Sequence, residues 1–193
     1  MALRTLGIDP GSRTTGFAVL ELHDRTYQSL ACDILRLTGT KDPHERLILL
    51  YEQISLIVDQ YAPDYVAVET PIYGKDPLAM LKLGRAQASI IMAVLHKKVP
   101  LFEYYPKAVK KAITGNGNAR KQQVAYMLQK ILQLSETDLP LDATDALAVA
   151  WCHMQKTTAH HGTRPEKQSG ITRLRKSSWE SFVEQNPKRI RKS

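Results

Sequence analysis

The apolar and polar positions of this chain alternate at first with the period of a strand and later with the period of a helix. Near the start, short apolar or alternating runs are separated by turn-forming residues; these runs cover residues 5–9, 15–21 and 27–35. The turns between them, at Pro10-Gly11 and at residues 22–25, connect neighbours along the chain. We therefore predict three strands that form an antiparallel meander.

Beyond residue 42 most apolar side chains recur at helical spacing. The predicted helices cover residues 43–61, 77–97, 106–113, 119–133 and 141–154, and the predicted short strands between them cover residues 65–69 and 101–104. We expect Asn118 to be the N-cap of the fourth helix. Three strands followed by alternating helices and strands predict an α/β fold, with a mixed five-stranded sheet flanked by helices.

Four acidic residues have apolar neighbours. Asp9 and Glu69 each close a predicted strand, and Asp142 and Asp145 lie three residues apart on one face of the last helix. Carboxylates in apolar surroundings are unfavourable unless they are paired or hold a metal, and a set of oxygen ligands suits Mg²⁺, with Mn²⁺ as a substitute. We predict that the four acids bind two such ions and catalyse hydrolysis of a phosphodiester.

Other interpretations of these residues remain open. An Asp before Pro-Gly is often only a turn former, and a single Asp-x-x-Asp pair is weak evidence for a metal site. The segment from Gly7 to Gly16 is also compatible with the first phosphate loop of an actin-like or sugar-kinase ATPase. Such an ATPase needs two lobes and further glycine-rich loops, so we favour the metal site.

The basic residues are unevenly distributed. Residues 75–130 contain 11 Lys and Arg against two acidic residues, and residues 156–193 contain 10 against three, whereas residues 1–74 carry a net charge of −4. A basic surface beside an acidic site is suited to a nucleic acid, whose backbone it can hold. We divide the chain into a nuclease domain, residues 1–155, and a basic, flexible tail, residues 156–193. The tail either folds on nucleic acid or a partner, or only aids solubility.

Composition limits the cellular setting. The chain has 193 residues, 43% of them hydrophobic, and its two cysteines, Cys32 and Cys152, lack metal-ligand spacing. The start has no signal-peptide pattern, and the apolar runs look too interrupted to span a bilayer. We expect a cytoplasmic protein with reduced thiols and no membrane association.

Five segments, in order along the chain, closely resemble motifs of the RuvC family, the Holliday-junction resolvases with a ribonuclease-H-like fold. They are LGIDPGSRTTG at 6–16, VAVE at 66–69, LKLGRAQ at 81–87, FEY at 102–104 and LDATDAL at 141–147. The resemblance implies a bacterial homodimer that nicks four-way DNA junctions symmetrically with Mg²⁺, together with the branch-migration proteins RuvA and RuvB. It also implies that Asp9, Glu69, Asp142 and Asp145 are the metal-binding catalytic acids.

The resemblance also suggests how the chain contacts DNA. Lys110 and Lys121 fall where the family places basic residues against the backbone, and the helix at 77–97 falls at the family's dimer interface. The further candidate contacts are Tyr73, Arg85, Lys111 and Arg120. Many relatives have a junction-wedging phenylalanine three residues after the strand-end glutamate. Here that position is Ile72, so either Tyr73 takes the role or the junction opens differently.

Two alternative functions remain. A catalytically silent junction-binding scaffold would share the fold, although all four acids are present here. A YqgF-type RNA-processing nuclease belongs to the same superfamily, but the LKLGRA helix favours the RuvC family. We therefore expect a structure-selective DNA endonuclease that acts in recombination and repair.

Overall fold

A five-stranded mixed sheet lies at the centre of the computed structural model, which describes residues 2–71, 74, 76–134 and 139–159. The described strands are β1 (Leu3–Asp9), β2 (Thr14–His23), β3 (Thr26–Arg36), β4 (Tyr65–Glu69) and β5 (Leu101–Tyr104). The described helices are α1 (Pro43–Tyr61), α2 (Pro77–His96), α3 (Pro106–Thr114), α4 (Lys121–Leu132) and α5 (Leu141–Ala159). The spatial order β3-β2-β1-β4-β5 confirms the predicted mixed α/β sheet.

The antiparallel meander predicted for the first three strands is confirmed. β1 is antiparallel to β2, which is antiparallel to β3, while β4 and β5 run parallel to β1. The β2–β3 hairpin turns at Asp24 and Arg25, whose φ angles of 47° and 67° suit a two-residue turn that matches the twist of the strands. Both strands are longer than predicted, and β2 runs on to His23, into positions that we had assigned to the turn.

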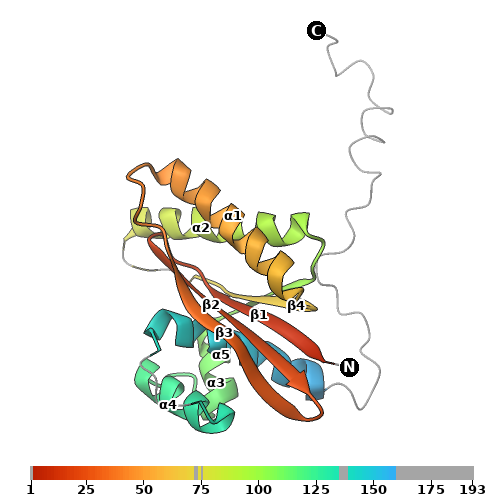
Figure 1. Ribbon diagram of the computed structural model, residues 1–193. Helices are drawn as coiled ribbons and strands as arrows, with labels where there is room; N and C mark the ends of the chain where they lie inside the picture. The colour runs from red at the N-terminus through yellow and green to blue at the C-terminus, as the bar shows by residue number, and fades with distance from the viewer. Residues whose placement is uncertain (1, 72–73, 75, 135–138, 160–193) are drawn as a thin grey trace, which may run out of the picture.

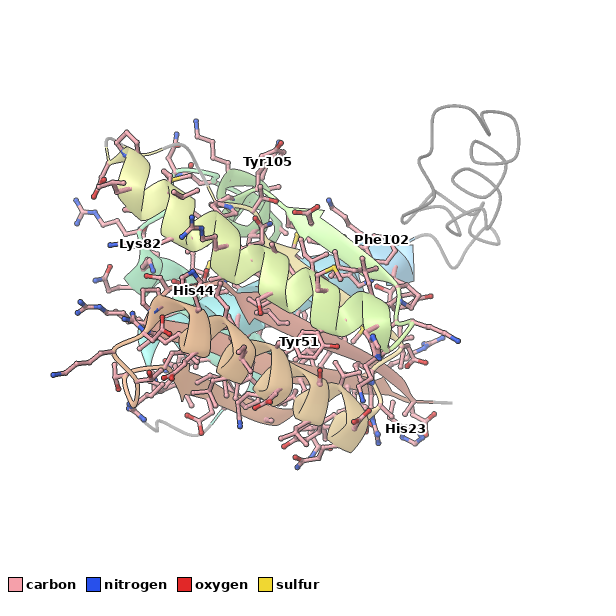
Figure 2. All side chains as sticks on the ribbon, turned by 90° about the horizontal axis from the view of Figure 1, so that it is seen from above. His23, His44, Tyr51, Lys82, Phe102 and Tyr105 are labelled. Carbon is pink, nitrogen blue, oxygen red and sulfur yellow. The ribbon has the colours of Figure 1, made fainter. Side chains whose placement is uncertain are left out.

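Helices cover both faces of the sheet (Figure 1). α1 and α2 lie on one face, and α3, α4 and α5 lie on the other. Seen from above, α1 and α2 run side by side, with Tyr51 on the side of α1 that faces α2 (Figure 2). The hydroxyl of Ser89 in α2 donates a hydrogen bond of 2.7 Å to the carbonyl of Leu47 in α1. Two apolar cores result, one on each face.

Two glycines let α5 approach the sheet closely. A Cβ at Gly7 would lie 2.1 Å from the carbonyl oxygen of Ala146, and a Cβ at Gly16 would lie 1.9 Å from the carbonyl oxygen of Asp142. Both distances are far below any van der Waals contact, so only glycine fits under this helix. The two glycines therefore set the height of the N-terminal half of α5 above β1 and β2.

Several predicted boundaries were wrong. Asn118 is not an N-cap; α4 begins at Lys121 with Arg120 as its N-cap, and the Gln123 side chain accepts a hydrogen bond of 2.9 Å from the Arg120 backbone N–H. α5 continues to Ala159, five residues past its predicted end, and the hydroxyls of Thr157 and Thr158 donate to the carbonyls of His153 and Met154. The division of the chain into a domain and a tail stays a prediction. Most of the predicted tail, residues 160–193, lies outside the described residues.

Helix α2 corrects the expectation that the apolar runs of this chain are too interrupted to span a bilayer. By length and composition alone α2 is long and apolar enough to cross a membrane, since it has only two charged residues, Lys82 and Arg85. One such helix does not by itself indicate a membrane span, and 22% of its apolar window is buried. In this fold the apolar side chains of Ile90 and Val94 pack into the core between the sheet and α1.

Replacing Gly7 by alanine tests the close approach of α5. The added methyl group must displace α5 or β1, and forced overpacking of this kind costs about 1–3 kcal/mol. We expect the free energy of unfolding in urea to fall by at least about that amount. Gly39→Ala is the matched control, because nothing lies within 4 Å of the new methyl group. Equal stability of the two variants would contradict the packing described here.

Candidate metal centre

Two carboxylates lie side by side at the carboxyl edge of the sheet. Asp9 ends β1 and Glu69 ends β4, and the parallel register pairs Ile8 with Val68, so the two acids follow paired residues. Alternation along each strand turns both acids toward α5, since Ile8 and Val68 belong to the core on the opposite face. The convergence predicted for these two strand ends is therefore present.

The first turns of α5 bring the other two acids to the same edge. Asp9, Asp142 and Asp145 each offer a carboxylate oxygen, and these oxygens all lie within 4.8 Å of one another. Glu69 completes the group from the side, since it lines the same cavity of about 250 Å³ as Asp9, together with Pro71, Leu83 and other residues. The structure therefore gathers all four predicted acids.

Burial and mutual repulsion make the acids hard to ionise. Burial, followed by the negative charge of Asp145, raises the pKa of Asp9 from 3.8 to about 7. Burial, followed by the charge of Asp9, raises the pKa of Glu69 from 4.5 to about 8. Such crowding is typical of a cation site, because a divalent ion relieves both the repulsion and the desolvation. The oxygen-only donor set fits a hard cation.

Two lysines partly balance this negative charge. Lys121, the first residue of α4, forms an ion pair with the Asp145 carboxylate, and the pKa of its amine is raised by this pairing although burial alone would lower it. Lys110 lies close enough to Glu69 for its charge to favour the ionised carboxylate. Both residues were predicted to contact DNA; the structure places them at the rim of the acidic site.

The other predicted DNA contacts differ in position. Arg120 directly precedes Lys121 and caps α4, so it lies beside the acidic site. Lys111 on α3 and Arg85 on α2 are exposed, and no contact with the four acids is seen in the described part of the chain. Tyr73 and Ile72 lie outside the described residues, so the question of the wedge stays a prediction.

Sequence reasoning missed one residue of the site. The hydroxyl of Thr14, at the start of β2, donates a hydrogen bond of 3.0 Å to the Asp142 carboxylate. This bond holds one oxygen of Asp142 in a fixed direction, which is how neighbours of metal ligands usually act. Sequence carries no signal for this role, since the two residues are 128 positions apart.

His153 has a structural role. It is buried, and its Nδ1 lies 2.8 Å from the hydroxyl of Tyr104. Burial, with a further effect from the charge of Lys156, lowers the pKa of His153 to about 4, so its ring is neutral under most conditions. It ties α5 to β5 at a distance from the acids.

Comparison with known proteins assigns the family. The family model described as "Crossover junction endodeoxyribonuclease RuvC" matches residues 5–153. The chain belongs to the RuvC family. Two relatives with that name are the proteins of Salinibacter ruber, 42% identical with 96% of this chain and 97% of the relative covered, and of Christiangramia forsetii, 43% identical with 96% and 92% covered.

Solved RuvC structures have the same fold. The chain is similar to Thermus thermophilus RuvC, with 29% identity, a TM-score of 0.73, and 83% of this chain and 98% of that chain covered. It is also similar to the T. thermophilus RuvC described as "in complex with Holliday junction substrate", with 26% identity, a TM-score of 0.72, and 81% and 96% covered. The predicted ribonuclease-H-like sheet is therefore confirmed.

The raised pKa values predict how the stability of the metal-free protein depends on pH. Each of the two carboxyls has a folded pKa above its unfolded value, so the stability linked to Asp9 and Glu69 is present at low pH and lost as pH rises toward 7–8. We expect the free energy of unfolding in chelator to fall from about pH 6.5 to about pH 8.5. Mg²⁺ binds only the ionised carboxylates, so it should stabilise the protein more at the higher pH.

Two features sharpen this measurement. The Asp9→Asn variant removes one titrating carboxyl, so its stability should change less over the same pH range. His153 acts in the opposite sense, because its lowered pKa removes stability only as pH falls below 6.5 toward 4. A metal-free stability that is flat or rises between these pH values would contradict the electrostatics described here.

Proposed function

We propose that this chain is a structure-selective DNA endonuclease that resolves four-way junctions by paired, symmetric hydrolysis during homologous recombination and repair. One observation supports this most strongly: in a RuvC-family fold, four carboxylates from β1, β4 and α5 converge at one sheet edge. Relatives of 42–43% identity have the name crossover junction endodeoxyribonuclease. The protein is accordingly a hydrolase that acts on phosphodiester bonds.

We propose Asp9, Glu69, Asp142 and Asp145 as the catalytic acids, which hold two Mg²⁺ ions, with Mn²⁺ as a substitute. Bound there, the ions would supply activated water and neutralise the leaving 3′-oxygen. The chain provides the orientation: Thr14 fixes one oxygen of Asp142, and the glycine contacts fix the height of α5. Lys121 and Lys110 lower the negative potential that an incoming phosphate meets.

Two alternatives are less favoured. A silent scaffold would have no need of buried acids with raised pKa values, since these are unfavourable without a cation. A YqgF-type RNA-processing nuclease would belong to another family than the one that matches residues 5–153. Neither alternative gains support from the geometry of the site.

We propose that the protein acts as a homodimer through α2, which would place two metal centres on one junction. The exposed face of α2 presents apolar side chains, among them Leu81 with 52% and Met92 with 59% of its surface exposed. Neighbouring α1 adds Leu56, which is 59% exposed. Apolar side chains gathered on one exposed face are typical of a protein interface. We further propose RuvA and RuvB as partners and the bacterial cytoplasm as the location, on family membership.

Cleavage of a mobile four-way junction, beside linear duplex of the same sequence, tests the proposed function. The wild type should nick the junction symmetrically with Mg²⁺ and should not act in chelator. Asp9→Asn should reduce cleavage by more than about 100-fold, since changes to mere neighbours of metal ligands already cost 10–100-fold. Junction binding by this variant should persist, because removing one negative charge does not weaken attraction to phosphate.

Asp64→Asn is the matched control. Asp64 lies at the start of β4, at the opposite edge of the sheet, where its carboxylate accepts a hydrogen bond of 2.8 Å from the Arg4 backbone N–H. This variant should cleave like the wild type. Tight binding by the wild type without nicks in Mg²⁺ would support the scaffold instead, and full activity of Asp9→Asn would refute the proposed metal site.

A further inference from the structure

A basic side chain lies at the end of β3, near the acids. Arg36 ends β3, and the antiparallel register pairs it with Thr14, the residue that donates to Asp142. Paired residues of neighbouring strands point to the same face, about 5 Å apart. Arg36 therefore faces the α5 side of the sheet, one strand beyond Thr14, in line with the acids.

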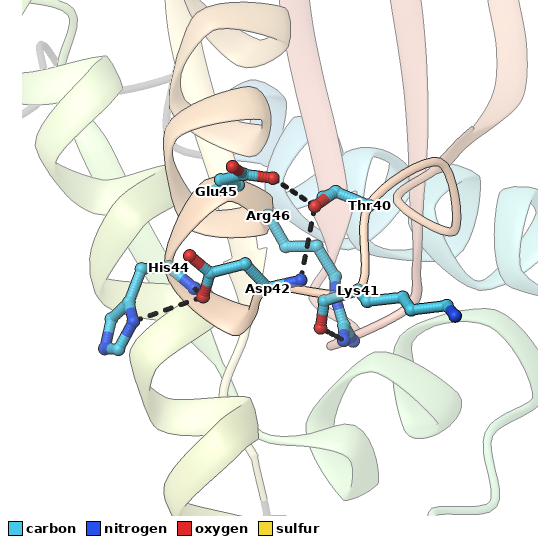
Figure 3. A network of polar contacts seen from close by, with 6 residues as sticks. All are labelled: Thr40, Lys41, Asp42, His44, Glu45 and Arg46. Carbon is cyan, nitrogen blue, oxygen red and sulfur yellow. Dashed lines mark hydrogen bonds and ion pairs between the residues drawn. The ribbon is translucent and has the colours of Figure 1, made fainter.

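Two more basic residues, Arg13 and Lys41, lie near the end of β3 in the chain or in space. Arg13 precedes Thr14, and its carbonyl accepts a hydrogen bond of 2.8 Å from the N–H of Leu37, so Arg13 lies beside the end of β3. Lys41 follows in the loop between β3 and α1, and its side chain points away from α1 (Figure 3). The Arg46 guanidinium holds this loop through a hydrogen bond of 2.9 Å to the Lys41 carbonyl.

These three exposed side chains, Arg13, Arg36 and Lys41, are here called the β3 rim. No ion pair of the β3 rim with a carboxylate is found in the described part of the chain. Nearby acids have other partners: Asp42 caps α1 by accepting from the His44 N–H at 2.9 Å, and Glu45 accepts from the hydroxyl of Thr40 (Figure 3). The positive charge of the rim is therefore available to a ligand.

Basic side chains from two parts of the fold lie around the acids. Lys121 pairs with Asp145 and the charge of Lys110 acts on Glu69, while Arg36 lies one strand beyond Thr14, the residue that donates to Asp142. A single DNA strand with its scissile phosphate over the acids has further phosphates on both sides. Cations from two parts of the fold can hold more of these phosphates than Lys110 and Lys121 alone.

We propose that the β3 rim binds backbone phosphates of the cleaved strand other than those that Lys110 and Lys121 contact. This inference rests on the proposed function and adds a DNA-binding surface to it. Arginine suits the role, because its planar guanidinium binds phosphate oxygens in pairs. The sequence does not indicate this surface, because acidic residues outnumber basic residues over residues 1–74.

The salt dependence of junction binding tests the β3 rim. The double variant Arg13→Gln, Arg36→Gln is compared with the protein that retains both arginines, each in the Asp9→Asn background so that no cleavage occurs. If each arginine neutralises one phosphate, the slope of log K against log salt becomes shallower by about 1.8, or about 0.9 for each contact. A variant with Arg13→Gln and Arg36→Lys should have a slope between those of the parent and the double Gln variant, since lysine keeps the positive charge at this position.

A charge-matched control uses the opposite edge of the sheet. Arg25, in the β2–β3 turn, and Lys98, between α2 and β5, are exposed and lie far from the acids along the strands. The double variant Arg25→Gln, Lys98→Gln removes the same charge, so any long-range effect of net charge should be equal. Its salt slope should not change.

Replacing phosphates by uncharged methylphosphonates on the cleaved strand locates the contact. On one flank of the scissile bond, this replacement should weaken binding of the protein with both arginines and should leave the Arg13→Gln, Arg36→Gln variant nearly unaffected. Lys121→Ala should instead lose its sensitivity to replacement at other phosphates.

The outcomes separate the two proposals. Equal salt slopes for the rim variant and the Arg25, Lys98 variant would refute the β3 rim, while wild-type cleavage would leave the proposed function standing. Failure of the wild type to bind or cleave the junction would refute the proposed function itself. Thermal melts of both double variants should match the parent, because the substituted side chains are exposed.

Discussion

The close contact between α5 and the sheet is the constraint on which the site depends. Gly7 and Gly16 leave no room for any side chain beneath this helix, so its backbone carbonyls lie almost directly on β1 and β2. A helix at an ordinary packing distance would carry Asp142 and Asp145 away from Asp9. Because protein interiors are densely packed and barely compressible, this height is fixed by contact and changes little. The two glycines therefore help to bring the acids together.

The same closeness makes the metal-free site unfavourable. Three carboxylates within 4.8 Å, with Glu69 beside them, repel one another, and burial adds to the effect, as the raised pKa values of Asp9 and Glu69 show. The ion pair of Lys121 with Asp145 offsets part of this repulsion. The rest of the fold must supply the remaining stability, and the two apolar cores do so from both faces of the sheet. Strain at a functional site with compensation elsewhere is a common arrangement.

The edge of the sheet also orders the charges around the acids. Each strand contributes one residue to this edge of the sheet. In the spatial order β3, β2, β1, β4, β5 these residues are Arg36, Thr14, Asp9, Glu69 and Tyr104. The first turns of α5 lie above this row, and the N-terminus of α4 lies at its side. The mixed topology thus positions both the acids and their basic borders.

The sequence alone determined the elements and the identity of the acids. Local periodicity marks α1 and β4 to the residue, and Asp9, Glu69, Asp142 and Asp145 stand out because charged residues are rare among apolar neighbours. The prediction of Asn118 as the N-cap of α4 was wrong, since several neighbouring polar residues are also suited to that position and the N-cap is Arg120. Contacts between distant segments were decided only by the tertiary structure. The bond from Thr14 to Asp142, the ion pair of Lys121 with Asp145 and the place of Arg36 all depend on strand register and helix height, which no short stretch of sequence encodes.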